Sequence, residues 1–273
     1  MSFSYTSERK RLYESIYRCI CCASTDYANP DGVCEFATKS PRQTIPVSNF
    51  GDIENAKIWL ILTNPKGDHN DSNVGHLVSN YNVRGRENLT VDHVDLIFQY
   101  FSTYFQRDRI HPFFNPFMAL LDGLIVDGHV CTFQNGGICA VDVIKCPTIK
   151  AWQQFVRTVE GKKVWHNCLG RVRAPGPNHF IIEQIKSHEP PILIFAQTTA
   201  GLIGVEYKGD GIGTLQGFDE IKIFRKQDPR RLSIALGRMQ NLYYYLNQDR
   251  DSTQTLHNTI QKVISNILSG AIY

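Results

Sequence analysis

The sequence predicts an α/β fold: a three-layer α/β/α sandwich around a central, mostly parallel four-stranded sheet. Two observations lead to this prediction. Several segments of strand length are continuously apolar, which is typical of strands buried on both faces in a parallel sheet. Segments with helical character separate them along the chain, and parallel strands joined by helices place helices on both faces of the sheet.

Four short apolar segments are the predicted strands, and each follows or precedes residues that favour turns. They span residues 56–63, 138–146, 192–196 and 221–224. Ligands of such sheets bind at the carboxyl ends of the strands. The residues that follow the first, second and fourth of these strands are therefore the places where we expect a site.

Six further segments are predicted helices from their apolar periodicity or composition. They span residues 8–20, 91–106, 112–126, 178–188, 231–247 and 254–269. Because neither an internal repeat nor a long linker interrupts these elements, we expect a single domain over residues 1–273.

The composition limits the class of protein. Hydrophobic residues make up 42% of the 273 residues and charged residues 20%, which excludes a disordered chain. A stretch of about 18 apolar residues, as a membrane span needs, is absent, and the N-terminal segment lacks the apolar region of a secretory signal. We therefore expect a cytoplasmic monomer without membrane contact. The net charge of +3 neither requires nor excludes nucleic acid.

Two polar residues stand out, one directly after a predicted strand and one inside a predicted strand. Asn64 directly follows the first strand, and is either a plain turn residue or an amide that orients a water or a substrate. Asp142 lies among Ile, Val, Cys and Ala in the second strand. Burying a carboxylate is costly unless it is paired, so Asp142 is either a hydrogen-bonded structural residue or an acceptor directed into a pocket.

The eight cysteines are either buried small hydrophobic residues or ligands of a metal centre. Cys19 and Cys22 form a C-x2-C pair, Cys146 ends the second strand, and Cys168 precedes a helical segment. Four thiolates that meet in space suit zinc or an iron–sulfur cluster. Any member of this set could be replaced by Cys21, Cys34, Cys131 or Cys139.

Together these motifs resemble the uracil-DNA glycosylase superfamily, most closely its iron–sulfur branch, families 4 and 5. The resemblance extends from about residue 12 to about residue 245, and its most specific part is the Val-Asp-Val-Ile-Lys-Cys-Pro segment at 141–147. It implies the sandwich fold, DNA as the partner and a [4Fe–4S] cluster, with zinc as the alternative. The implied ligands are Cys19, Cys22, Cys146 and Cys168.

The resemblance also implies roles for the loop after the first strand. Asn64 would position the attacking water, together with Asp68 or Asp71, and Tyr81 would stack on the flipped base unless it is an ordinary loop aromatic. In strict uracil enzymes a Tyr after this motif blocks bases that carry a 5-substituent. No such Tyr follows Pro65 here, so we expect a pocket that accepts 5-substituted bases.

Asp142 stands where the uracil enzymes carry an Asn that reads the base. A carboxylate only accepts hydrogen bonds, so it would repel O4 of uracil and accept from the N4 amino group of cytosine. If Asp142 were protonated it would mimic the amide, which keeps uracil as an alternative.

The usual third motif, His-Pro-Ser, is missing, and its nearest equivalent begins at Gln227. There Asp228 would replace the His, Arg230 and Arg231 would contact phosphates, and Leu232 would wedge into the base stack. The alternative is that this segment is simply the charged start of a helix.

The sequence thus predicts a monofunctional DNA glycosylase that excises a 5-modified cytosine, such as hydroxymethylated or glucosylated cytosine in phage DNA. Some members of the superfamily have a similar role in antiviral defence. One alternative is a repair glycosylase for uracil or other deaminated bases. The other is a non-catalytic iron–sulfur or zinc protein that binds DNA, which the missing third motif favours.

Overall fold

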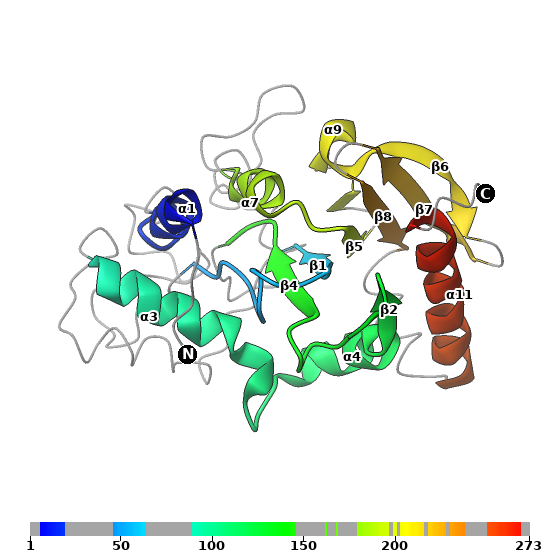
Figure 1. Cartoon of the computed structure of the whole chain (residues 1–273), viewed down its shortest axis with the longest axis horizontal. Helices are drawn as coiled ribbons and strands as arrows, with labels where there is room; N and C mark the ends of the chain where they lie inside the picture. Colours follow the sequence, from blue (N-terminus) through cyan, green and yellow to red (C-terminus); the bar gives the residue numbers. More distant parts are fainter. Residues whose placement is uncertain are drawn as a thin grey trace. The chain divides into compact units, whose positions relative to one another are not determined.

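The computed structural model describes residues 6–19, 46–63, 89–145, 162, 168, 179–196, 199–200, 203–215, 218–227, 230–237 and 250–268. These residues form a mixed α/β structure with one large sheet and a separate two-stranded hairpin (Figure 1). The predicted fold class, α/β, is therefore confirmed. The finer expectation, a three-layer sandwich, stays a prediction.

The large sheet has six strands in the order β4-β1-β5-β8-β7-β6. Its strands are β1 (Ile58–Leu62), β4 (Ile138–Asp142), β5 (Ile192–Ala196), β6 (Asp210–Leu215), β7 (Phe218–Lys226) and β8 (Arg231–Leu236). The four segments predicted as strands coincide with β1, β4, β5 and part of β7, whereas β6 and β8 were not predicted. The prediction of four strands is therefore wrong.

Four adjacent strands of this sheet run parallel. β5 pairs in parallel with both β1 and β8. Backbone bonds join Ile58 to Gly137 where β1 begins and Leu62 to Val143 where it ends, so β4 also runs parallel to β1. β7 is antiparallel to β8 and β6 is antiparallel to β7, which adds a ribbon at one edge.

Continuous burial explains why the parallel strands read as apolar runs. Every residue of β1 and of β4 is buried, as a strand covered on both faces must be. β8 is equally buried but has Arg231 and Ser233 between its apolar residues. This polar–apolar alternation has the period of a strand. The prediction of a helix over 231–247 is thus wrong for the residues of β8.

The described helices agree largely with the predicted ones. They are α1 (Ser7–Tyr17), α3 (Val91–Ser102), α4 (Asn115–Leu121), α7 (Phe180–His188), α9 (Val205–Lys208) and α11 (Arg250–Leu268), with 3-10 turns η2 (Tyr104–Gln106) and η3 (Pro112–Phe114). The predicted helix over 112–126 ends early, because Leu124–Val126 forms β2 of a hairpin with β3 (His129–Cys131). Within the described chain, no helix combines the length and apolarity needed to cross a membrane.

The chain divides into two compact units. Unit 1 comprises Met1–Asn49, Leu62–Phe101 and Asp142–Ser187; unit 2 comprises Phe50–Ile61, Ser102–Val141 and His188–Tyr273. The boundary passes through β1 and β4, whose last residues, Leu62 and Asp142, belong to unit 1. The expectation of a single domain stays a prediction.

Each unit has its own packing contacts. In unit 1, α1 lies against α3 through Tyr13 and Phe98, whose ring centroids are 4.3 Å apart, and through the Lys10–Asp95 ion pair at 3.0 Å. In unit 2, α11 packs against α4 and β2. The Gln261 side chain of α11 accepts from the backbone N–H of Ile125 at 2.6 Å and donates to its carbonyl at 3.1 Å.

Candidate functional site

The structure describes about half of the residues that the sequence singled out. Those described are Cys19, Asp142, Cys168, Arg230, Arg231 and Leu232. Those outside the described residues are Cys22, Asn64, Asp68, Asp71, Tyr81, Cys146 and Asp228. For the second group, the roles given above stay predictions.

Asp142 is the last residue of β4, and it is only 1% exposed. Neither carboxyl oxygen has a hydrogen-bond partner among the described residues. Burial raises the pKa of Asp142 to about 7, and the positive charge of Lys145 opposes the rise. Of the two interpretations of this residue, a paired structural carboxylate finds no support in the described part of the chain.

The end of β4 lies directly beside the end of β1. The backbone N–H of Val143 donates to the carbonyl of Leu62, and that of Ile144 donates to the carbonyl of Thr63, both at 2.9 Å. Asn64 is the next residue along the chain after Thr63. The two strand ends where the sequence predicted site residues are thus neighbours in the sheet.

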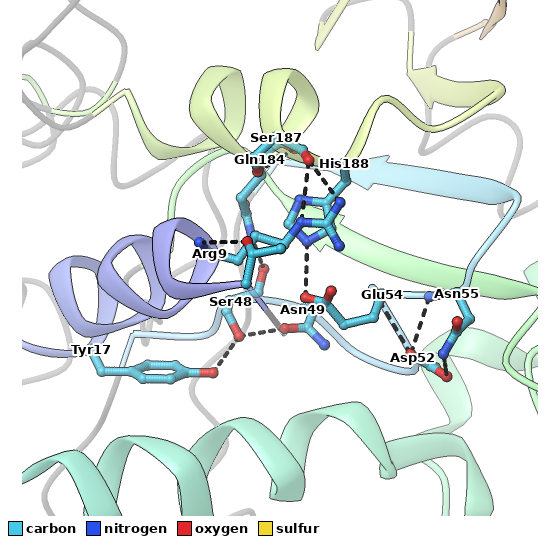
Figure 2. Close-up of polar contacts among 11 residues, drawn as sticks. Arg9, Tyr17, Ser48, Asn49, Asp52, Glu54, Asn55, Gln184, Ser187 and His188 are labelled. Atoms are coloured by element: carbon cyan, nitrogen blue, oxygen red, sulfur yellow. Dashed lines mark hydrogen bonds and ion pairs between the residues drawn. The ribbon is translucent and has the colours of Figure 1, made fainter. Parts of the chain in front are cut away.

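A buried polar network in unit 1, here called the Ser48 cluster, comprises Tyr17, Ser48, Asn49, Lys145 and Gln184. Figure 2 labels Tyr17, Ser48, Asn49 and Gln184. The Ser48 hydroxyl bonds to the Tyr17 hydroxyl at 2.5 Å and donates to Oδ1 of Asn49. The Ser48 carbonyl accepts from Nζ of Lys145 at 3.2 Å and from Nε2 of Gln184 at 3.1 Å. Ser48 therefore ties α1 and α7 to the segment that follows β4.

Lys145 connects this cluster to Asp142. Its Nζ donates to the backbone carbonyl of Asp142 as well as to that of Ser48. The ammonium group therefore bonds to main-chain oxygens, and its charge reaches the Asp142 carboxyl without a hydrogen bond to it. That Lys145 acts on Asp142 was not predicted from the sequence, although a lysine three residues after a buried Asp pointed to such an interaction. For Ser48 and Gln184 the sequence offers no such signal.

Two of the four predicted metal ligands are described. Cys19 follows α1, and both it and Cys168 are buried in unit 1. Buried thiols are the donor type that an iron–sulfur cluster or zinc takes, so these two residues fit the predicted group. Within the described ranges alone, no three potential ligands come together. Because Cys22 and Cys146 lie outside those ranges, the ligand set stays a prediction.

The structure contradicts the predicted roles of Arg231 and Leu232. They begin β8, where Leu232 is fully buried and Arg231 is 2% exposed. The guanidinium of Arg231 donates to the carbonyls of Pro190 at 3.2 Å and Tyr207 at 2.8 Å. Because the carbonyls already hold the guanidinium of Arg231, and Leu232 packs among the apolar residues of the core, both side chains have structural roles. Arg230 is exposed and donates to the carbonyl of Ile267 at 3.1 Å, and its role on DNA stays a prediction.

A second buried polar pair lies in unit 2 (Figure 2). Nε2 of His188 is 3.1 Å from Oε1 of Glu54, and the His188 ring lies 5.3 Å from that of Trp59. Just before Glu54, the Asp52 carboxylate accepts from the backbone N–H groups of Glu54 and Asn55, which fixes that turn. Each of these polar groups has a partner, so they read as structural contacts.

Comparison with known proteins assigns no family to this chain, because neither a family model nor a curated protein matches its sequence.

Proposed function

We propose that this protein is a DNA glycosylase, which flips a modified base out of DNA and hydrolyses its N-glycosidic bond to leave an abasic site. The buried carboxyl of Asp142 carries this proposal. It lies at the carboxyl end of a parallel strand, where α/β sheets bind their ligands, and it has no partner in the described part of the chain. An ionisable group kept buried at such a position is a candidate for function, because it costs stability.

The strand order supports the same location. β1 is followed along the chain by β4 on one side of it in the sheet, and then by β5 on the other side. In open α/β sheets, ligands bind at the carboxyl ends of the strands, where the strand order reverses. Asp142 ends β4 at this edge, and the predicted water-positioning residue Asn64 follows β1 by two residues in the sequence.

The residue type at position 142 suits cytosine in either protonation state, since a carboxylate accepts from the N4 amino group and a protonated carboxyl can also donate to N3. The missing Tyr after Pro65 favours a base with a 5-substituent. We therefore propose 5-modified cytosine, hydroxymethylated or glucosylated, as in phage DNA, and a role in antiviral defence. Asn64 with Asp68 would orient the water, Tyr81 would stack on the base, and Arg230 would contact the DNA backbone.

The predicted [4Fe–4S] cluster, or zinc in its place, would have a structural role. Cys19 and Cys168 would hold it together with Cys22 and Cys146. Bound there, the cluster would cross-link distant segments of the chain and would take no part in hydrolysis. Anaerobically purified protein should then be brown, whereas a colourless protein with stoichiometric zinc would replace the cluster by a zinc site.

A second candidate function is the repair of uracil or other deaminated bases. The raised pKa of Asp142 favours it, because a protonated carboxyl can donate to O4 of uracil while it accepts from N3–H.

The test is an abasic-site assay on matched duplexes that carry uracil, cytosine, 5-hydroxymethylcytosine or its glucosylated form. We expect wild-type protein to act on the modified cytosines and to spare cytosine. Asn64→Ala should bind the same duplexes and release no base. Release of uracil alone would replace the first candidate by the second. DNA binding without any base release would contradict both and leave a binding protein.

A further inference from the structure

We infer that Asp142 is the general acid of the reaction, and that its carboxyl gives a proton to the Watson–Crick edge of the departing base. The inference rests on the proposed function and assigns a step within it. The missing His-Pro-Ser motif leaves that step, neutralising the charge on the departing base, without a residue.

The surroundings of Asp142 retain a proton on the carboxyl. An ionised carboxylate needs water or hydrogen-bond donors, and this one is buried without a donor among the residues that the structure describes. The nearby donors Lys145 and Gln184 both bond to the carbonyl of Ser48. Lys145 is the charged group in the described chain whose field acts on Asp142, and Tyr17 is the other titratable side chain of the Ser48 cluster.

A neutral carboxyl matches the edge of a cytosine-type base. It offers one O–H donor and one acceptor oxygen side by side. N3 of such a base accepts and its N4 amino group donates, so Asp142 can make both hydrogen bonds at once. In the hydrogen bond from the Asp142 O–H to N3, the proton already points at N3, the atom that receives it.

The step is balanced as follows. The Asp142 proton moves to N3, the bond between C1′ and N1 breaks, and its electron pair stays on N1, so the base leaves neutral rather than as an anion. Water then adds to C1′ of the oxocarbenium-like sugar and loses a proton. The Asp142 carboxylate takes up one proton from solvent, so each turnover consumes one water and returns the acid to its starting state.

Lys145 is a positioning residue for this acid. Its bonds to the carbonyls of Ser48 and Asp142 hold the end of β4, while its charge opposes the effect of burial on the pKa of Asp142. The result, a pKa of about 7, suits a general acid, because a proton held near the working pH is both present and transferable.

The test is the single-turnover rate of base release between about pH 6 and about pH 9, on whichever of the cytosine, 5-hydroxymethylcytosine and glucosylated duplexes wild-type protein attacks. Release of uracil alone would overturn the inference, because N3 of uracil already carries a proton. We expect the wild-type rate to fall about tenfold per pH unit above about 7, as the acid loses its proton. Asp142→Asn should be slower by roughly 10²- to 10⁴-fold at pH 6 and lack this fall. Asp92→Asn, which changes an exposed carboxyl of α3, should match the wild type.

Lys145→Gln gives an independent readout. Removing its charge should move the fall in rate to higher pH, and an unchanged or lower midpoint would contradict the inference. A pH profile of Asp142→Asn that matches the wild type would also overturn the inference about Asp142. In that case, abasic sites made by the wild type would still support the proposed glycosylase function. A wild type that makes no abasic site on any duplex would overturn the function and the inference with it.

Discussion

The two ends of the parallel sheet each bury an ionisable side chain, and the two differ in their hydrogen-bond partners. Arg231 at the start of β8 donates to two carbonyls, those of Pro190 and Tyr207, which replace the water that it loses. Asp142 at the end of β4 has no such partner in the described chain. Partners offset the cost of burying an ionisable group, whereas a group without partners costs stability and is a candidate for function.

The largest expected effect is on the pH dependence of stability. The pKa of Asp142 rises from 3.8 to about 7 on folding, so between these values the folded protein holds a proton that the unfolded chain has lost. Its free energy of unfolding therefore falls as pH rises through this window, by up to about 4 kcal/mol in total. Asp142→Asn should remove this fall, and be more stable than the wild type at pH 8 but not at pH 4.

Urea unfolding of both proteins across this pH range measures the difference. If the free energies of unfolding of the wild type and of Asp142→Asn differ by a constant amount from pH 4 to pH 8, Asp142 is ionised and partnered in the folded protein.

Arg231→Met should have the next largest effect. The substitution keeps an apolar stem of similar length but leaves the carbonyls of Pro190 and Tyr207 without their donor. Each orphaned acceptor costs about 1 to 3 kcal/mol, so we expect a loss of about 3 kcal/mol in the free energy of unfolding. A loss below about 1 kcal/mol would show that the two carbonyls do little for Arg231, and Arg231 would then no longer differ from Asp142 in having effective partners.

Ser48→Ala tests the network that holds the segment after β4. It removes the hydroxyl between Tyr17 and Asn49 while leaving the Ser48 carbonyl in place, and should cost about 1 to 2 kcal/mol. Ser15→Ala is the matched control, because that exposed hydroxyl bonds only within α1 and should cost less than about 0.5 kcal/mol. Equal effects in chemical denaturation would argue that the Ser48 cluster contributes nothing specific.

The smallest effect is expected for a charge in water. Lys186 pairs with Glu183 on α7 at 3.0 Å, and both side chains are more than half exposed. Lys186→Met should change the free energy of unfolding by less than about 0.5 kcal/mol, because exposed ion pairs contribute little. A cost comparable to that of Arg231→Met would mean that the charge of a side chain, rather than its burial, determines how much stability its removal costs.

The sequence was most informative where burial is uniform. β1 and β5 are continuous apolar runs and β4 is apolar up to Asp142, so their assignment as strands followed from composition alone. The prediction of a helix over the residues of β8 is wrong, because Asp228-Pro229 and the arginines after it suggested the charged start of a helix. Arg231 is tolerated in β8 only through acceptors 24 and 41 residues away, which no local pattern reveals.

The candidate site was predictable in the same uneven way. Asp142 stood out because a carboxyl in an apolar strand is unusual, and its burial is confirmed. The contacts of Ser48 with Lys145 and Gln184 join segments 97 and 136 residues apart. Such contacts depend on how the chain folds back on itself, and Ser, Lys and Gln carry no local pattern that announces them.

The most direct measurement is the titration of the Asp142 carboxyl itself by carbon-13 NMR, with its signal assigned by comparison with Asp142→Asn. We predict one aspartate carboxyl that loses its proton near pH 7, well above the ordinary value of 3.8. If the Asp142 carboxyl instead titrates near that ordinary value, it is a partnered, ionised structural residue, and both its role as general acid and its contrast with Arg231 are contradicted.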